Sequence, residues 1–188
     1  MKKYLYAIIL LFFLTNMLYS CESEHEKKER EDQKTLQKAE TEIYNQYINN
    51  SLITGTTPYS NCYGGNQSCD ENGCSKITVS TPHNSDVLVT IKKNNEVVRH
   101  AFIQAHSSYT FELPNGIYQP FFYYGKGWNP EKLMKTAPCG EIKGGFISNE
   151  SFGKDDPQTL YDTVLTYELI LQEKGNFSTT PSNQNDAL

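Results

Sequence analysis

The sequence predicts a mainly β protein, an antiparallel β-sandwich preceded by a signal peptide and a charged N-terminal helix. Short stretches rich in Val, Ile, Tyr and Phe follow one another from residue 55 onward, which is typical of strands. Gly, Pro and Asn separate these stretches, as expected of tight turns. The residues before that point carry charge instead, so the chain changes character once along its length.

Residues 1–20 have the pattern of a secretory signal peptide. Lys2 and Lys3 precede an apolar run from Tyr4 to Leu14. A helix needs about 20 apolar residues to cross a bilayer, and this run is shorter. Its length and basic flank favour export and cleavage. The alternatives are an uncleaved membrane anchor or an ordinary signal peptide with an incidental cysteine.

The end of this segment, "LYSC" at 18–21, resembles a bacterial lipobox, although Tyr19 is larger than the residue usual at its position. The resemblance implies that Cys21 becomes the acylated first residue, which would tether the protein to a membrane surface. The acidic stretch "ESEHEKKERED" that follows is similar to the surface-export signals of some Gram-negative lipoproteins. We therefore expect a lipid anchor in the outer membrane, facing either the surface or the periplasm.

Charge excludes one class of partner. Cleavage before Cys21 would remove two lysines and no acid, which takes the net charge from −5 to −7. No run of basic residues is longer than two, as at Lys92-Lys93. Nucleic acid is therefore not an expected partner.

A charged helical stalk or linker is predicted for residues 21–54. From Glu22 to Glu42, 13 of 21 residues are charged, and neither Gly nor Pro occurs. One narrow apolar stripe at helical spacing is formed by Leu36, Ala39, Ile43 and Tyr47. We expect the stripe to dock on the domain or on another copy of the chain.

Residues 55–176 are predicted to form the β-sandwich, and the polar residues 177–188 a flexible tail. "NNE" at 94–96 and "PNG" at 114–116 are expected turns, and "GKGWNP" at 125–130 an expected loop. Asp155-Asp156-Pro157 is typical of a turn or a helix start. The predicted strands cover 76–80, 86–93, 97–105, 108–113, 117–124, 139–148 and 164–172.

Two resemblances support this organisation. "YTFELPNGIYQPFF" resembles the strand–turn–strand signature of transthyretin-like and carboxypeptidase-regulatory sandwiches, which implies an Ig-like or transthyretin-like sandwich with Tyr118 pointing inward. "SDVLVTIKKNNEVVRHAFI", "LPNGIYQPFFYYGKGWNP", "KDDPQTL" and "VLTYELILQEKGNFST" are similar to an uncharacterised family of Gram-negative lipoproteins, over about Pro58 to Asn185. That family implies no activity and no functional residues.

Four cysteines beyond Cys21 form an even set, Cys62, Cys69, Cys74 and Cys139. In an exported protein such a set favours two disulfides over a zinc site. The cluster contains no histidine and no C-x-x-C pair, and its spacings fit structural zinc poorly. Three pairings are possible. We favour Cys69–Cys74 as a small loop and Cys62–Cys139 as a long closure.

An aromatic set was considered as a binding surface. Alternation places Phe121 and Tyr123 on one face of their strand, opposite Tyr118, Phe122 and Tyr124. Together with Trp128, the first two could stack on a sugar or contact a protein. The alternative is that this face is buried beneath the helix or a long loop.

The sequence contains no recognisable catalytic motif. His83, His100 and His106 lie outside any metal-spaced cluster, and we expect surface or core histidines. No nucleophile elbow or recognisable carboxylate dyad is present. We expect no metal and no cofactor. Asp162-Thr163-Val164 resembles a short motif that some Gram-negative bacteria O-glycosylate.

The leading hypothesis is a non-enzymatic, lipid-anchored sandwich that binds an envelope protein or glycan through the region from Tyr123 to Trp128. An alternative is an envelope hydrolase whose site combines distant residues such as His100, Asp155 and Asp156. A further alternative is a structural subunit of a surface assembly that uses unpaired strand edges.

Overall fold

The computed structural model describes residues 24–69, 73–169 and 180–188. The predicted signal peptide, Cys21 and the predicted strand residues beyond 169 lie outside these ranges. The chain divides after Ile43 into two compact units, which are taken in turn.

Helix α2 (Glu24–Tyr47) makes up the described part of the first unit and runs into the second. It confirms the predicted helix. None of its residues is buried, and pairs such as His25–Glu29 and Lys38–Glu42 lie four residues apart on its surface. Among the described residues, no helix is both long and apolar enough to span a bilayer. Docking of the apolar stripe stays a prediction.

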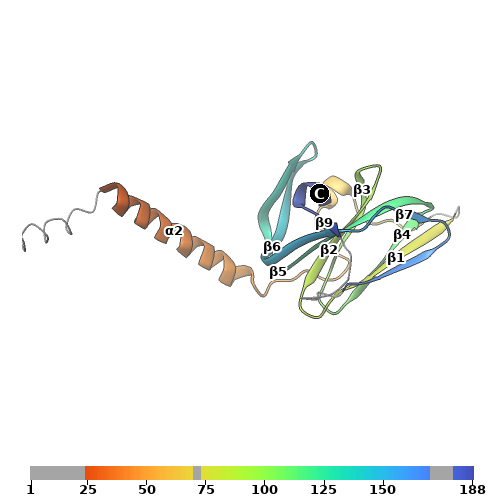
Figure 1. The fold of residues 1–188 in the computed structure, drawn as a ribbon, viewed down its shortest axis with the longest axis horizontal. Helices are drawn as coiled ribbons and strands as arrows, with labels where there is room; N and C mark the ends of the chain where they lie inside the picture. Colours follow the sequence, from red (N-terminus) through yellow and green to blue (C-terminus); the bar gives the residue numbers. More distant parts are fainter. Residues whose placement is uncertain (1–23, 70–72, 170–179) are drawn as a thin grey trace, which may run out of the picture. The chain divides into compact units, whose positions relative to one another are not determined.

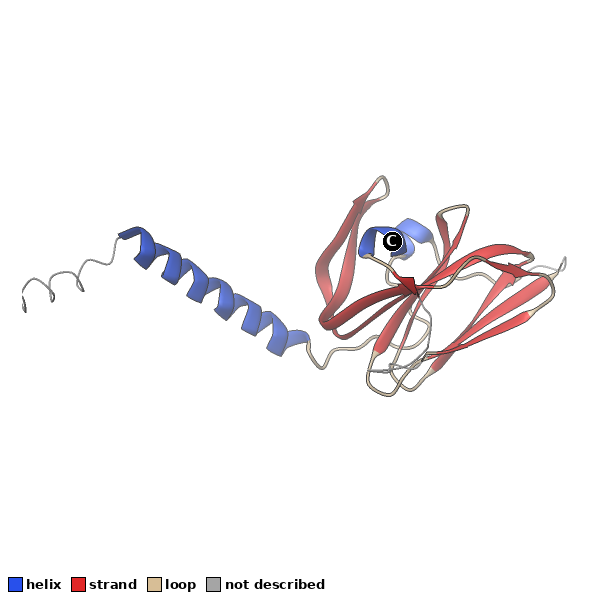
Figure 2. Ribbon diagram, in the orientation of Figure 1, coloured by secondary structure: helices blue, strands red, loops and turns tan. Residues whose placement is uncertain are grey.

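The second unit is a β-sandwich, as predicted, with a small sheet of order β4-β1-β8 and a large sheet of order β3-β2-β5-β6-β9 (Figures 1 and 2). Strand β7 pairs with the start of β5. Pairing is antiparallel except between β1 and β8, which run parallel. The strands are β1 (Cys74–Ser80), β2 (Asp86–Lys93), β3 (Glu96–Ile103), β4 (Ser108–Pro114), β5 (Gly116–Ala137), β6 (Gly140–Lys154), β7 (Gln158–Leu160), β8 (Val164–Glu168) and β9 (Thr180–Pro181).

The largest difference from the sequence prediction is the β5–β6 hairpin. The predicted loop "GKGWNP" is strand, because β5 continues through irregularities in its register with β6, such as that between Tyr124 and Lys126. Gly125 and Gly127 have no side chain at this point, where a Cβ on Gly125 would overlap Phe146. Residues 155–157 lead into β7 and begin no helix.

One hydrophobic core fills the space between the two sheets. Alternate residues of each strand supply it, which explains the period-two pattern of the sequence. Tyr118 is buried there, as the resemblance implied, and its hydroxyl donates to the carbonyl of Pro114 at 2.8 Å. The core includes Ile77, Val79, Val87, Val89, Ile91, Ile103, Phe111, Leu113, Phe122, Tyr124 and Tyr167.

A second core lies on the other face of the large sheet, beneath a layer that we call the cap. The cap consists of residues 50–63, the β5–β6 hairpin from Gly127 to Ser148, and residues 180–188. It contains the short helices α3 (Ser60–Tyr63) and α4 (Gln184–Ala187), which Figure 1 shows beside the hairpin. The second core is formed by Tyr59, Leu88, Phe102, Tyr123, Trp128, Met134, Ile142, Phe146 and Leu188.

The described part of the predicted flexible tail is ordered, so that prediction was wrong for residues 180–188. Strand β9 pairs with β6, and Asn183 caps α4 by accepting from the N–H of Asp186 at 3.0 Å. Thr90 and Lys92 on β2 donate to the carbonyls of Ala187 and Asp186. The polar composition misled the prediction because this segment is held mainly through its backbone and its last two side chains.

The N-terminal part of the cap, at Gly55 and Thr56, forms backbone hydrogen bonds with the outer edge of β3. Gly55 donates to the carbonyl of Phe102 at 2.8 Å, and Phe102 donates to Thr56 at the same distance. The side chain of Asn66 both donates to and accepts from the backbone of His100. Covering an edge in this way prevents further strands from pairing there.

Candidate functional site

The aromatic residues proposed as a contact surface are buried. Phe121, Tyr123 and Trp128 are 4%, 1% and 2% exposed. They therefore cannot stack on a ligand that arrives from solvent, and the prediction of a binding site at these residues was wrong. The alternative interpretation was that this face is buried beneath the helix or a long loop, and in the structure the cap covers it.

Packing explains why these side chains face inward. The ring of Trp128 meets Phe102 and Phe146 edge-on, each at 5.3 Å between centroids. The hydroxyl of Tyr123 accepts the N–H of Phe146 at 2.8 Å and donates to Glu150. Burial raises the pKa of Tyr123 far above its usual value, and the bond to Glu150 adds to the effect.

Both predicted disulfides are present with the favoured pairing. Cys62–Cys139 joins α3 to the turn of the β5–β6 hairpin across 77 residues, with its Cα atoms 5.3 Å apart. Cys69–Cys74 closes a short loop before β1, at 5.6 Å. The cysteines are therefore crosslinks of the fold. No group of three or more His, Cys, Asp or Glu residues within the described ranges could hold a metal.

The residues proposed for a hydrolase are not brought together. His100 has no exposed surface, and its ring stacks on Tyr59. Asp155 accepts hydrogen bonds from Tyr167 at 2.7 Å and from Gln158 at 3.1 Å. Within the described chain no hydrogen bond or ion pair joins His100 to an aspartate, which removes the basis for a site at these residues.

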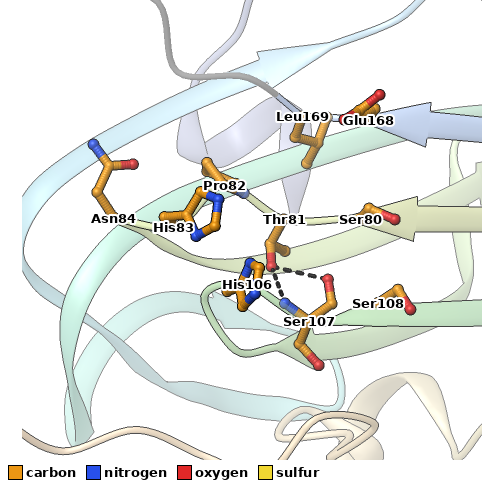
Figure 3. A pocket seen from close by; sticks show the side chains of 10 residues that line it. All are labelled: Ser80, Thr81, Pro82, His83, Asn84, His106, Ser107, Ser108, Glu168 and Leu169. Carbon is orange, nitrogen blue, oxygen red and sulfur yellow. Dashed lines mark hydrogen bonds between the residues drawn. The ribbon is translucent and has the colours of Figure 1, made fainter.

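A pocket of about 690 Å³ lies at one end of the small sheet. It is an open hollow between the β1–β2 loop, the β3–β4 loop and the end of β8 (Figure 3). Its lining residues are mostly of polar types, although apolar atoms contribute more of the exposed wall than polar atoms do. The wall is formed by Ser80, Thr81, Pro82, His83, Asn84, His106, Ser107, Ser108, Glu168 and Leu169.

Two histidines that lie 23 positions apart in the sequence meet in this pocket. The rings of His83 and His106 stack with their centroids 4.1 Å apart and their planes inclined by 22°. His106 has a φ of 55°, a left-handed conformation that is uncommon outside glycine. Its N–H donates to the carbonyl of Pro82 at 3.0 Å, which fixes the two loops to each other.

Thr81 anchors the floor of the pocket. Its N–H donates to the carbonyl of Ser107 at 2.9 Å. Its Oγ1 lies 3.1 Å from both the backbone nitrogen and the carbonyl oxygen of Ser107, accepting from the first and donating to the second (Figure 3). The same hydroxyl reaches the carbonyl of Gln104 at 2.5 Å. The two loops therefore form a preorganised wall, in which the polar groups can bind without first becoming ordered.

The pocket has the chemistry of a binding site. Serine hydroxyls, the amide of Asn84 and the carboxylate of Glu168 can each exchange hydrogen bonds with a polar ligand, and the stacked imidazoles offer an aromatic edge or face. In the described part of the chain no hydrogen bond couples a serine hydroxyl of the wall to either imidazole. The serine–histidine pairing that activates a nucleophile is not formed there.

From the sequence, His83 and His106 were expected to be separate surface or core histidines. The missing step was strand pairing. Ser80 at the end of β1 lies opposite Ser108 at the start of β4, so the loops that follow one strand and precede the other meet at the same end of the sheet. An antiparallel pairing of these strands, had it been assigned, would have placed the histidines together.

In comparisons with known proteins, no family model, no curated protein and no solved structure matches the chain.

Proposed function

We propose that this chain is a lipid-anchored, non-enzymatic binding protein of the bacterial cell envelope, with its contact site at the pocket of His83 and His106. The observation that carries the proposal is the convergence of two loops, joined by hydrogen bonds, on an open hollow at the end of a sandwich, lined mostly by polar residue types. Loops at the end of a rigid sheet scaffold are a common place for binding residues.

The envelope location rests on the N-terminal sequence and is supported by the disulfides. The lipobox resemblance at Cys21 provides the anchor, and the charged residues after it provide a spacer. Disulfides form and persist in oxidising compartments, which include the periplasm and the cell surface. Cys62–Cys139 and Cys69–Cys74 both fit such a location.

Binding is favoured over catalysis by what lines the hollow. It presents many separate hydrogen-bonding groups and no coupled nucleophile and base among the described residues. The hollow is also open, whereas chemistry benefits from exclusion of water.

The test is a binding measurement on the detergent-solubilised full-length protein with fractions of envelope polysaccharide and envelope protein. We expect saturable binding that weakens in His106→Asn, because asparagine tolerates the left-handed backbone but removes the ring. His25→Asn on the exposed helix is the control. Equal binding by His106→Asn and the unaltered protein would contradict the assigned site, and turnover of the bound material would contradict the non-enzymatic assignment.

The anchor has its own test. Cys21→Ser should move the protein from the membrane fraction to the soluble fraction, and the intact mass of the unaltered protein should include acyl chains on Cys21. A protein that stays membrane-bound after this substitution would contradict the anchor.

A further inference from the structure

The outer face of the small sheet is a flat array of polar side chains. Strand alternation directs every second residue outward, and three consecutive outward positions on each strand, nine in all, form an array whose members are partly or fully exposed. The pair Cys74 and Pro114 lies beyond the array on the same face. Five of the nine carry hydroxyls, and Val164 is the single apolar member. The array consists of Lys76, Thr78 and Ser80 on β1, Ser108, Thr110 and Glu112 on β4, and Val164, Thr166 and Glu168 on β8.

Strand register arranges these side chains in three rows across the sheet. Thr78 lies opposite both Thr110 and Thr166, which forms a row of three threonines. The hydroxyls of Thr78 and Thr110 are 2.9 Å apart and hydrogen-bonded. Neighbouring rows are two residues apart, or about 6.7 Å, so the three rows extend over about 13 Å.

The rows connect two hollows. The row of Ser108, Ser80 and Glu168 forms part of the His83–His106 pocket. A second hollow of about 480 Å³ includes residues of the other two rows, Lys76, Thr78, Thr110 and Glu112. Asn66, Gln67 and Ser68 border it, together with Tyr109 and Phe111, which belong to or pack against the core. One continuous polar track therefore runs from hollow to hollow.

We propose that this track binds a linear glycan, which lies along the three rows with one end in each hollow. Hydroxyl and amide groups both donate and accept hydrogen bonds, as the hydroxyls of a sugar do. The charges of Lys76 and Glu112 are paired at 3.6 Å, so the track carries little uncompensated charge there. At the end of the track formed by the pocket, the ring of His106 is available for stacking on a sugar ring.

A folded protein is a poorer occupant. The centres of protein interfaces are enriched in aromatic and apolar residues and depleted in charge. On this face Val164 is the one apolar side chain among nine. A glycan, in contrast, needs the repeated hydrogen-bonding groups that the rows provide.

This inference rests on the proposed function, since it extends the same pocket. The experiment is calorimetric titration of the detergent-solubilised full-length protein with size-fractionated neutral linear oligosaccharides and with peptidoglycan glycan strands. We expect affinity to increase with chain length until the oligosaccharide covers all three rows.

The discriminating variant is Thr78→Val with Thr110→Val, which keeps the shape and the strand preference of both positions but removes the hydroxyls. Affinity for the longest oligosaccharide should fall about tenfold or more, as expected for the loss of two hydrogen bonds, while binding of the shortest one that occupies the pocket is unchanged. Thr136→Val, at an exposed strand position of the β5–β6 hairpin, is the matched control.

The outcomes separate the two proposals. Equal affinity for short and long oligosaccharides, or no effect of the threonine variant, would overturn the glycan track and leave the pocket intact. Binding of an envelope protein alone, lost in His106→Asn, would also overturn the track and support the pocket. Oligosaccharide binding that His106→Asn leaves unchanged would overturn the assignment of the pocket.

Discussion

The backbone N–H of Tyr59 donates to Nε2 of His100 at 3.0 Å, and the two rings stack at 5.8 Å between centroids. The bond joins the cap to the central part of β3. Because Nε2 accepts, it must hold a lone pair, so the imidazole is neutral in the folded protein. Burial accordingly lowers the pKa of His100 to about 4, against an opposing effect of the Thr57 backbone.

The first prediction concerns acid stability. The unfolded chain has a histidine pKa near 6.5, so between pH 6.5 and pH 4 the unfolded state binds more protons than the folded state at this residue. The contribution of His100 to stability is complete above pH 6.5 and decreases by about 3 kcal/mol as the pH falls to 4. Urea unfolding at several pH values measures this slope.

The control is His100→Gln, which keeps an acceptor for the N–H of Tyr59 but does not titrate. Its stability should depend less steeply on pH in that range than that of the unaltered protein. His25→Gln removes an exposed histidine for comparison. If His100→Gln and the unaltered protein had the same slope, His100 would not be buried in the neutral form.

The second prediction compares the two disulfides. Loop-closure entropy gives about 4 kcal/mol for Cys62–Cys139, with its separation of 77 residues, and about 2 kcal/mol for Cys69–Cys74, with its separation of 5. Replacing both cysteines of a pair by serine should therefore lower the free energy of unfolding more for the long closure. Mass mapping without reduction checks the pairing, and four free thiols would contradict it.

The third prediction uses two glycines of the β5–β6 hairpin. Gly144 has a φ of +109°, and a Cβ there would come within 2.5 Å of Trp128. Gly144→Ala should destabilise the protein by about 2–5 kcal/mol through backbone strain and overpacking together. Gly140 has a φ of +118° with nothing within 4 Å of such a Cβ, so Gly140→Ala isolates the backbone strain.

Thermal unfolding and tryptophan emission report both variants, because Trp128 is the single tryptophan of the chain. The emission of the unaltered protein should be blue-shifted and poorly quenched by iodide, since Trp128 is buried. Equal destabilisation by Gly144→Ala and Gly140→Ala would indicate that Trp128 does not pack against Gly144.

The fourth prediction tests the docked C-terminal segment. Leu188 is 5% exposed within the second core, and its backbone accepts from the hydroxyl of Tyr63. Leu188→Ala should cost about 2–5 kcal/mol, the range for a buried leucine. Asn185→Ala, at an exposed position of α4, should have little effect, and similar effects of both substitutions would contradict docking.

The sandwich could be predicted because its strands alternate between core and solvent, and β2 was predicted at its observed bounds, 86–93. The cap could not be predicted from the sequence, for two physical reasons. The second face of β5 is as apolar as the first, so periodicity does not say what covers Tyr123. In addition, residues 180–188, which form one part of the cap, are polar and resemble a loose tail in the sequence.

The features of the candidate site could likewise be predicted only in part from the sequence. Two disulfides in place of a zinc site could be predicted from residue types and the expected compartment, and of the three possible pairings the favoured one is present. The His83–His106 stack could not, because it depends on which strands are neighbours and on the left-handed backbone at His106. Trp128 was misassigned because aromatic side chains serve cores and binding surfaces equally well.

The most direct test of the binding site is a ¹H–¹⁵N chemical-shift titration of the soluble chain from residue 22 with the oligosaccharide or envelope component that binds best. Shifts concentrated at Ser80, His83, His106, Ser108 and Glu168 are the predicted result. Shifts concentrated around Trp128 and the cap, with the pocket residues unchanged, would contradict the account.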